Sequence, residues 1–559
     1  MPISDQTNFL LAAQNLSVEQ LGDQLDVMAE KIGKQAICQV GAEYLVSLTR
    51  PERVVHGNLG RFGPMVRDGI AFFLSQISYR RLRRAILSQK RITAENDPGI
   101  RLLDLALHFP TLHKLGQVIA RTDGIEPRLK KWLITLEKGH YGTDRETLIQ
   151  NLDTWLMTVN PASAICLSPH ILAEGSVAAV FPFTCRVQGK DEQAKGVFKV
   201  LKPEIEAFLK EEMSILERVA VFFENNREIY GLKELKVVEL FREVQDDLVR
   251  EIDLTAEQKN LLEAAGLYRN VRGVHIPRLF SFCTTTVTAM EFLAGIRITD
   301  VEISPELREK LARRTFEAII CTPLFSTEEV ALFHGDPHAG NILAVPEKDP
   351  DDFTVALIDW TLAGRLSRTL RGHVVEMMVG IISTDIKKIC VSIRQMISDS
   401  DSKLHAKKMN ECVAEFMVAE VHQDDPLKKA FLLMAEMAML GYVFPADLIL
   451  FRKTFFTLEG VLADISPGFN MAEALENYLG RLLFEELPLR VSTGFFPLSD
   501  SSINYRSLIS NQSLGALSFY QAVSTWQNAM KTSFTFVETQ AKVTSDIWSC
   551  LWGRDLYWK

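Results

Sequence analysis

The spacing of apolar residues divides the chain into helical regions and one mixed region. Apolar positions recur every three or four residues over 17–48 and 64–160, which predicts helices. Residues 165–300 mix short strand-like runs with long helical patterns, and residues 366–480 return to helical spacing. We therefore predict an α+β protein with helical segments on both sides of a strand-containing core.

Two apolar runs in the mixed region predict a β-hairpin. Val177–Val187 and Val197–Leu201 are separated by a hydrophilic turn at residues 189–196. Lys199 lies in the middle of the second run, where a charge either protects an edge strand or binds phosphate. Because Asp and Asn residues suited to a nucleotide site follow further along the chain, we favour a role for Lys199 as a phosphate ligand. The mixed region also contains two long helical patterns, Glu204–Asn225 and Lys236–Ala265.

A glycine-containing loop in the second half of the chain has the residues of a magnesium-nucleotide site. Asp336 stands five residues before Asn341, and a later apolar run ends on Asp359. Mg²⁺ prefers oxygen ligands, so Asn341 and Asp359 are the predicted ligands and Asp336 would accept or orient an attacking hydroxyl. For either loop residue alone, a capping Asp or a turn-closing Asn is the simpler interpretation. His334 and His338 have zinc-like spacing, but no third ligand stands near them.

Further motifs occur before and after this loop. In chain order they are Lys114-Leu115-Gly116-Gln117, Ala173-Glu174-Gly175-Ser176, Lys199-Val200-Leu201-Lys202-Pro203, Glu251-Ile252-Asp253 with Glu257 following, His338-Ala339-Gly340-Asn341, and Asp359-Trp360-Thr361. This series resembles the UbiB (AarF) family of atypical protein-kinase-like proteins, in which motifs of these kinds follow in the same order. The resemblance implies a bilobal protein-kinase-like core with helical extensions at both ends.

The resemblance also implies roles for individual residues. Lys199 would bind the nucleotide phosphates with Glu251 as its ion-pair partner, Asp336 would be the catalytic aspartate, and Asn341 and Asp359 would hold Mg²⁺. The remaining nucleotide contacts would come from a phosphate-covering loop and from an interlobe hinge that reads adenine, represented here by Ala173, Gly175, Ser176, Glu291 and Leu293.

The N-terminal extension of such proteins folds over the site and contacts the helix that carries the Glu-x-Asp motif. Lys114, Gly116 and Gln117 would belong to that extension, with Asp253 and Glu257 on the opposing helix. Four parts of the chain are expected on this basis: a helical extension at 1–160, an N-lobe at 161–295, a C-lobe at 296–490, and a linker with a helical tail at 491–559.

Departures from the family pattern keep two alternatives open. Glu174-Gly175 interrupts an alanine-rich loop, and Ala339 stands where proline is usual. Trp360-Thr361 replaces Phe-Gly, and Asp-Trp is also found in aminoglycoside and choline phosphotransferases, so a small-molecule phosphotransferase is the first alternative. The second is a pseudokinase that binds nucleotide without turnover.

Composition restricts the partners and the compartment. The formal net charge of -9 gives no general attraction to nucleic acid phosphates, so no nucleic acid partner is expected. The eight cysteines form no Cys-x-x-Cys pair, which is typical of a reducing compartment. No signal peptide is read at the N-terminus, and the most apolar helical stretch, 430–444, contains Glu436 and is short of a bilayer span. We expect a cytoplasmic protein.

Two segments bear on membrane contact. Residues 79–91 have six basic side chains and no acidic one, which suits either an anionic membrane surface or acidic partners within the protein. The aromatic tail, with Trp548, Trp552, Tyr557 and Trp558, would anchor at a membrane or pack on the lobes. The resemblance implies ATP and Mg²⁺ as ligands, a small-molecule or lipid substrate, and phosphotransferase or ATPase activity that supports ubiquinone or other isoprenoid synthesis.

Overall fold

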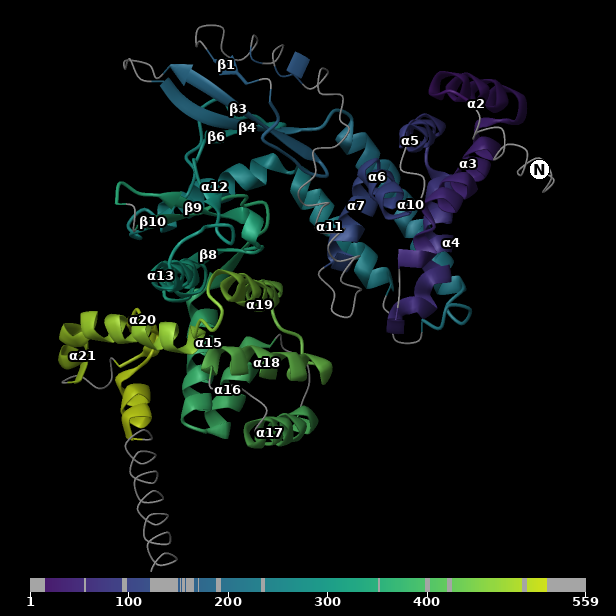
Figure 1. The fold of residues 1–559 in the computed structure, drawn as a ribbon. Helices are drawn as coiled ribbons and strands as arrows, with labels where there is room; N and C mark the ends of the chain where they lie inside the picture. The colour runs from purple at the N-terminus through teal and green to yellow at the C-terminus, as the bar shows by residue number, and fades with distance from the viewer. Residues whose placement is uncertain are drawn as a thin grey trace, which may run out of the picture. The chain divides into compact units, whose positions relative to one another are not determined.

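The computed structural model of the chain forms two compact units (Figure 1). The first comprises Met1–Leu262 with Pro277–Leu293, and the second Glu263–Ile276 with Ala294–Lys559. The structure describes residues 16–54, 57–92, 98–120, 149–150, 152, 156, 165–168, 170–186, 193–232, 237–349, 352–397, 403–419, 425–494 and 500–519. The aromatic residues of the predicted tail lie outside these ranges.

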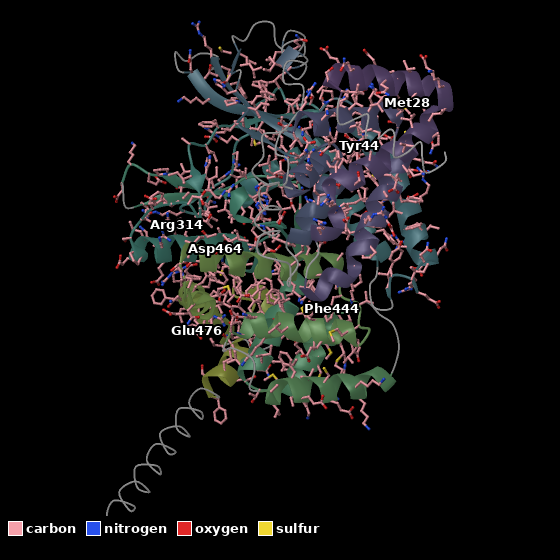
Figure 2. All side chains as sticks on the ribbon, turned by 45° about the vertical axis from the view of Figure 1, so that its right-hand side comes forward. Met28, Tyr44, Arg314, Phe444, Asp464 and Glu476 are labelled. Carbon is pink, nitrogen blue, oxygen red and sulfur yellow. The ribbon has the colours of Figure 1, made fainter. Side chains whose placement is uncertain are left out.

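The first unit begins with a bundle of helices. They are α2 (Val18–Ile32), α3 (Lys34–Thr49), α4 (Gly63–Gln76), α5 (Tyr79–Arg91), α6 (Pro98–Leu107) and α7 (Pro110–Ala120), with 3₁₀ turns at Pro51–Val54 and Gly57–Phe62. Ser17 and Gln20 form a capping box that starts α2, since the side chain of each accepts the backbone N–H of the other. Leu21 and Leu25 on α2 are buried in the bundle core, as is Tyr44 on α3, labelled in Figure 2.

Three arginines of the basic helix α5 pair with acidic residues of the same unit. Arg81 is buried, and its guanidinium pairs with Glu211 and Glu212. On the same helix, Arg80 lies 3.1 Å from Glu204 and Arg83 lies 2.9 Å from Asp26. For these three arginines the acidic partners are intramolecular, which supports the second of the two interpretations of this segment.

A five-stranded antiparallel sheet follows in the same unit. Its strands are β1 (Cys166–Leu167), β2 (Ala173–Glu174), β3 (Ala178–Arg186), β4 (Gln193–Leu201) and β6 (Val287–Glu291), in the order β1-β3-β4-β6 with β2 paired to β3. The predicted hairpin is confirmed, because β3 and β4 pair from Ala178↔Leu201 to Arg186↔Gln193. Phe181, Phe183 and Phe198 form part of the core on one face. Lys199 therefore lies on a central strand with neighbours on both sides.

Three long helices complete the first unit, α10 (Ile205–Asn225), α11 (Val237–Ile252) and the start of α12 (Leu254–Leu267). The single helix predicted over 236–265 is wrong, because the helix breaks at Asp253. The Asp253 carboxylate accepts the N–H of Ala256 at 2.9 Å and so caps a new helix. An N-cap aspartate inside an apolar periodic pattern is a signal that periodicity alone does not reveal.

The second unit contains two sheets. One has the order β5-β10-β9-β7, built from β5 (Val274–His275), β10 (Phe353–Leu357), β9 (Ile342–Pro346) and β7 (Ile296–Arg297). The other pairs β8 (Val330–His334) with β11 (Ala363–Ser367). Arg314, labelled in Figure 2, donates a hydrogen bond at 3.0 Å to Asp352, which directly precedes β10. This contact joins the helix that carries Arg314, α13 (Pro305–Phe316), to the sheet.

Helices make up the rest of the second unit. They are α13 (Pro305–Phe316), a π turn at Glu317–Cys321, α14 (Thr322–Leu324), a 3₁₀ turn at Ala339–Asn341, α15 (Arg368–Ile382), α16 (Ile386–Met396), α17 (Lys403–Val418), α18 (Pro426–Met439), α19 (Ala446–Ile465), α20 (Met471–Glu485), α21 (Leu487–Gly494) and a 3₁₀ turn at Ser502–Asn504. Phe333 on β8 packs edge-on against Phe451 on α19, so α19 covers the small sheet. None of the helices in the described ranges has the length and apolarity that a membrane crossing requires.

Part of the expected C-terminal linker is packed. Tyr505 and Leu508 are fully buried, and Arg490 donates to the Ser507 hydroxyl at 2.8 Å and to the Ile509 carbonyl at 3.0 Å. The Tyr505 hydroxyl also donates to Asp500 at 2.8 Å. Small polar side chains such as Ser507 therefore serve as hydrogen-bond partners in part of the segment that was expected to be a linker. The fold confirms the α+β class, whereas the four-part division of the chain stays a prediction.

Candidate functional site

The predicted catalytic loop begins at the end of β8. The Asp336 N–H donates to Nδ1 of His334 at 3.3 Å, and the His338 N–H donates to the Asp336 carbonyl at 2.9 Å. The Asn341 side-chain NH₂ also donates to that carbonyl, at 3.2 Å. Asp336 and Asn341 are therefore joined across one tight turn, as their spacing in the sequence predicts.

Strand pairing places Asn341 opposite Ile358, the residue before Asp359. Ile342 at the start of β9 pairs with Leu357 at the end of β10, so the residues just outside this pair are neighbours. The Ile358 N–H donates to the Asn341 carbonyl at 3.0 Å and extends the ladder by one bond. The two predicted metal ligands thus lie at the same end of one hairpin.

His334 connects the catalytic loop with the segment before Asp359. Its ring is fully buried, with Nε2 3.0 Å from the Ile358 carbonyl and Nδ1 accepting from Asp336. Burial lowers the pKa of His334, and hydrogen bonding to Ile358 opposes that shift in part. The neutral ring with Nε2 protonated satisfies both contacts, so His334 serves as a structural link and both of its nitrogens are used without zinc.

A residue far along the chain supports this loop. Thr454 on α19 is buried, and its hydroxyl lies 3.2 Å from the His334 carbonyl and 3.3 Å from the Gly335 carbonyl. Gly335 itself approaches Leu362 closely, since a Cβ at this position would lie 2.8 Å from the Leu362 side chain. Nothing in the local sequence pattern pointed to Thr454, because it stands inside a long apolar helix.

The donor atoms at the hairpin end fit Mg²⁺. Asn341 turns its NH₂ toward the Asp336 carbonyl, and its amide oxygen and the Asp359 carboxylate are hard oxygen donors. In the described part of the chain no cluster of three or more His, Cys, Asp or Glu side chains could hold a metal by itself. Mg²⁺ characteristically takes one or two protein ligands and completes its shell with phosphate oxygens and water. The pair is therefore suited to a metal that arrives with a nucleotide.

In the first unit, Lys199 has a different partner from the one expected. Its ammonium lies 2.7 Å from Glu257 on α12, and the Glu257 side chain is fully buried. We expected Glu251, but α11 ends at Ile252 and the chain turns at Asp253 before Glu257. This break gives Glu251 and Glu257 separate surroundings. The ion pair of Lys199 is thus with Glu257.

Glu251 instead connects the N-terminal extension to the turn before β3. Lys114 on α7 lies 2.5 Å from Glu251 and 3.7 Å from Asp247, and the Ser176 hydroxyl donates to Glu251 at 2.8 Å. The expected contact between the Lys-x-Gly-Gln helix and the Glu-x-Asp helix is present. Gly116 and Gln117 also lie in α7, although the Gln117 side chain is outside the described residues.

The predicted phosphate-covering loop is a tight turn between β2 and β3. Ala173 pairs with Val180, and the Gly175 N–H donates to the Ala178 carbonyl at 2.8 Å. Glu174, which interrupts the expected alanine run, lies 2.9 Å from the ammonium of Lys202 just beyond β4. The turn is held on both sides of Gly175, and sequence reasoning missed the Glu174–Lys202 contact.

The predicted hinge ends at one of the three places where the chain passes from one compact unit to the other, between Leu293 and Ala294. The Glu291 N–H donates to the Arg278 carbonyl at 2.8 Å, and its carboxylate pairs with the Arg278 side chain at 3.2 Å. The Phe292 N–H donates to the Lys195 carbonyl. An adenine-reading role for Glu291 and Leu293 stays a prediction.

Comparison with known proteins identifies a domain and a group of similar proteins. Residues 167–393 match the ABC1 atypical kinase-like domain. The chain is 26% identical over 436 residues to the "Probable protein kinase UbiB" of Actinobacillus pleuropneumoniae serotype 5b, covering 74% of this chain and 76% of the relative. The protein of the same name from Haemophilus ducreyi is 25% identical over 429 residues, covering 73% and 76%. The chain therefore contains an ABC1 atypical kinase-like domain and is similar over most of its length to proteins named UbiB.

A solved structure, the complex of Rv3197 with erythromycin from Mycobacterium tuberculosis, also matches, with 14% identity and a TM-score of 0.36 over 66% of this chain and 86% of that one. The domain match and the UbiB relatives, rather than this structure, confirm the resemblance seen in the motifs and the bilobal kinase-like class of the fold. The UbiB motifs are present on the expected kinds of element: Lys199 on a strand, Lys114 on a helix, and Asp336 on a loop after a strand.

The departures from the UbiB pattern have structural explanations. Trp360, in place of Phe, is fully buried, and its indole N–H donates to the Leu357 carbonyl at 3.2 Å. The Trp360 ring packs edge-on against His334, with ring centroids 4.9 Å apart. Ala339 occupies the first position of a 3₁₀ turn whose N-cap is His338, so the loop keeps its shape without proline. The catalytic, metal-binding and nucleotide-binding roles of these residues stay predictions.

Proposed function

We propose that this protein, which is similar to UbiB, binds Mg-ATP and transfers or hydrolyses its terminal phosphate. The observation that supports this most strongly is the joining of Asp336, Asn341 and Asp359 at one end of a hairpin. Hydrogen bonds hold the backbone of Asp336 and Asn341, and the ladder of β9 and β10 ends at Ile358, directly before Asp359. Phosphoryl transfer depends chiefly on positioning and on stabilising charge, which is what such an arrangement provides.

Each residue has a chemical role in this proposal. Asp336 accepts the proton of an attacking hydroxyl or orients a water molecule, because it stands where kinase-type sites place that carboxylate. Asn341 and Asp359 hold Mg²⁺, which when bound neutralises the charge of the phosphate oxygens. Lys199 binds the phosphates, and its contact with Glu257 orients the ammonium on β4.

The substrate is proposed from the similarity to UbiB proteins alone. The relatives carry the name UbiB, and we propose a small-molecule or lipid substrate that belongs to ubiquinone or other isoprenoid metabolism, handled in the cytoplasm or at a membrane surface. No binding of nucleic acid is proposed, since the net charge of -9 gives no general attraction to phosphates of a nucleic acid backbone.

The test is ATP turnover in the presence of Mg²⁺, measured alone and with liposomes, phenolic quinone precursors and small alcohols. Wild type should turn over ATP, and Asp336→Asn and Asp359→Asn should abolish turnover while the fold is retained. Asp300→Asn, which removes an exposed carboxylate of the same unit, is the matched control and should keep wild-type activity. Wild-type turnover in both Asp336→Asn and Asp359→Asn would contradict the catalytic assignment.

A small-molecule phosphotransferase is the second candidate, favoured by Trp360-Thr361 after Asp359. Stimulation by a small alcohol with transfer of phosphate to it would support this candidate, whereas stimulation by liposomes with phosphate release would support a lipid-coupled ATPase. Tight nucleotide binding with no phosphate release under any of these conditions would identify a pseudokinase.

A further inference from the structure

Thr361 holds the carboxylate that is proposed to bind Mg²⁺. Its hydroxyl donates to Oδ1 of Asp359 at 2.5 Å, and its backbone N–H lies 3.3 Å from the same oxygen. A hydrogen bond to a carboxylate is shorter and stronger than one between neutral groups, and this distance is in the range for O–H to carboxylate. Two donors from one residue therefore fix the direction of the Asp359 side chain.

This contact is a feature of the chain rather than of its family motif. The UbiB pattern has Asp-Phe-Gly, and glycine at the third position has no hydroxyl to offer. Here the third residue is Thr361. The replacement of glycine therefore adds an interaction with the metal-binding group itself.

The backbone on both sides of Asp359 is also held. Asp359 has φ of 57°, in the left-handed region that residues with a side chain rarely adopt. The next side chain, Trp360, is fully buried and donates to the Leu357 carbonyl, and the preceding Ile358 N–H donates to Asn341. With the backbone held in this way, the remaining freedom of the carboxylate is its side-chain rotation, which Thr361 restricts.

We propose that Thr361 is a positioning residue that orients the Asp359 carboxylate for Mg²⁺ and thereby sets the Mg²⁺ affinity of the nucleotide site. The inference rests on the proposed function, because it takes Asp359 as a metal ligand. Groups that hydrogen-bond a metal ligand change metal affinity by about 10–100-fold when they are removed. Thr361 acts through Asp359 and is not itself proposed to touch nucleotide or metal.

The experiment is a Mg²⁺ titration of nucleotide binding, followed with a fluorescent ATP analogue on the full chain. Thr361→Val keeps the shape of the side chain and removes the hydroxyl, so the half-saturating Mg²⁺ concentration should rise about 10-fold or more. Thr361→Ser keeps the hydroxyl and should keep the wild-type midpoint. Thr361→Ala is a second variant with the same expectation as Val, for use if Val reduces folding.

Thr354 provides a matched control on the neighbouring strand. Its hydroxyl donates to the Glu347 carboxylate in the same sheet, away from the hairpin end that carries Asp359. Thr354→Val should leave the half-saturating Mg²⁺ concentration unchanged. This control shows whether the effect of Thr361→Val comes from the contact with Asp359 or from the loss of any threonine–carboxylate hydrogen bond in this region.

The outcomes separate the inference from the proposed function. A wild-type Mg²⁺ midpoint in Thr361→Val and Thr361→Ala would overturn the positioning role, while the loss of Mg²⁺ dependence in Asp359→Asn would still support the metal site. If nucleotide binding by wild type did not depend on Mg²⁺, or if Asp359→Asn kept that dependence, both the metal site and the role of Thr361 would be overturned.

Discussion

The partner of Lys199 can be established by comparing two double-mutant cycles. The structure pairs Lys199 with Glu257 at 2.7 Å, whereas the family resemblance implied Glu251. The perturbations are Lys199→Met combined with Glu257→Gln in the first cycle and with Glu251→Gln in the second. Each cycle measures how far the effects of the two changes depart from additivity.

The magnitude follows from burial. The Glu257 side chain is fully buried and the Lys199 side chain is 12% exposed, so Lys199→Met leaves a buried carboxylate without its ammonium partner. Removing one member of a buried ion pair costs about 3–5 kcal/mol, and replacing both members costs much less. We expect a coupling toward the upper end of the range of about 0.5–3 kcal/mol that contacting residues show. The effects of Lys199→Met and Glu251→Gln on the free energy of opening should add to within about 0.5 kcal/mol.

The assay is hydrogen exchange of backbone amides on β4 and α12, converted to local opening free energies. A local measurement is preferable because a chain with two compact units need not unfold in one step. A third cycle with Lys114 and Glu251, which lie 2.5 Å apart, is the positive control for coupling at Glu251. A Lys199–Glu251 coupling equal to or greater than the Lys199–Glu257 coupling would refute the pairing.

Two further predictions concern buried polar groups, Glu212 in the first unit and Thr454 behind the predicted catalytic loop. Burial raises the pKa of Glu212 to about 7 from 4.5, although Arg81 lowers it, so this carboxyl binds a proton at a higher pH in the folded protein than in the unfolded chain. The contribution of Glu212 to the free energy of unfolding is complete below pH 4.5 and is lost as the pH rises through 7. In thermal unfolding, the stability of wild type relative to Glu212→Gln should therefore fall by about 3 kcal/mol over this pH range. A difference between the two proteins that does not change with pH would contradict this. Thr454→Val removes the hydroxyl that donates to the buried carbonyls of His334 and Gly335. We expect the free energy of unfolding, measured by thermal unfolding, to fall by about 1–3 kcal/mol and ATP turnover to decrease. Thr454→Ser keeps the hydroxyl and should restore both. Equal behaviour of the Val and Ser variants would rule out this support of the catalytic loop.

Local patterns in the sequence were sufficient for much of the fold and part of the site. The hairpin of β3 and β4 was predicted because apolar runs bounded by a polar turn specify strands locally. The Asp336–Asn341 loop and the strand that ends before Asp359 were predicted for the same reason, since the determining residues are near one another in the chain. The long helix over 236–265 was not correct, because the capping Asp253 competes with apolar periodicity.

The tertiary structure decided which distant side chains meet. Lys199 is 58 residues from Glu257, Thr454 is 120 residues from His334, and Arg81 is 131 residues from Glu212. Several carboxylates of the α11–α12 segment have suitable chemistry for Lys199, and only the break at Asp253 and the packing of α12 select among them. The sequence by itself determined the kinds of groups and the local turns that carry them. The pairing of those groups depended on the packing of elements far apart in the chain, because hydrogen bonds and ion pairs form only between atoms that the fold brings within about 3 Å.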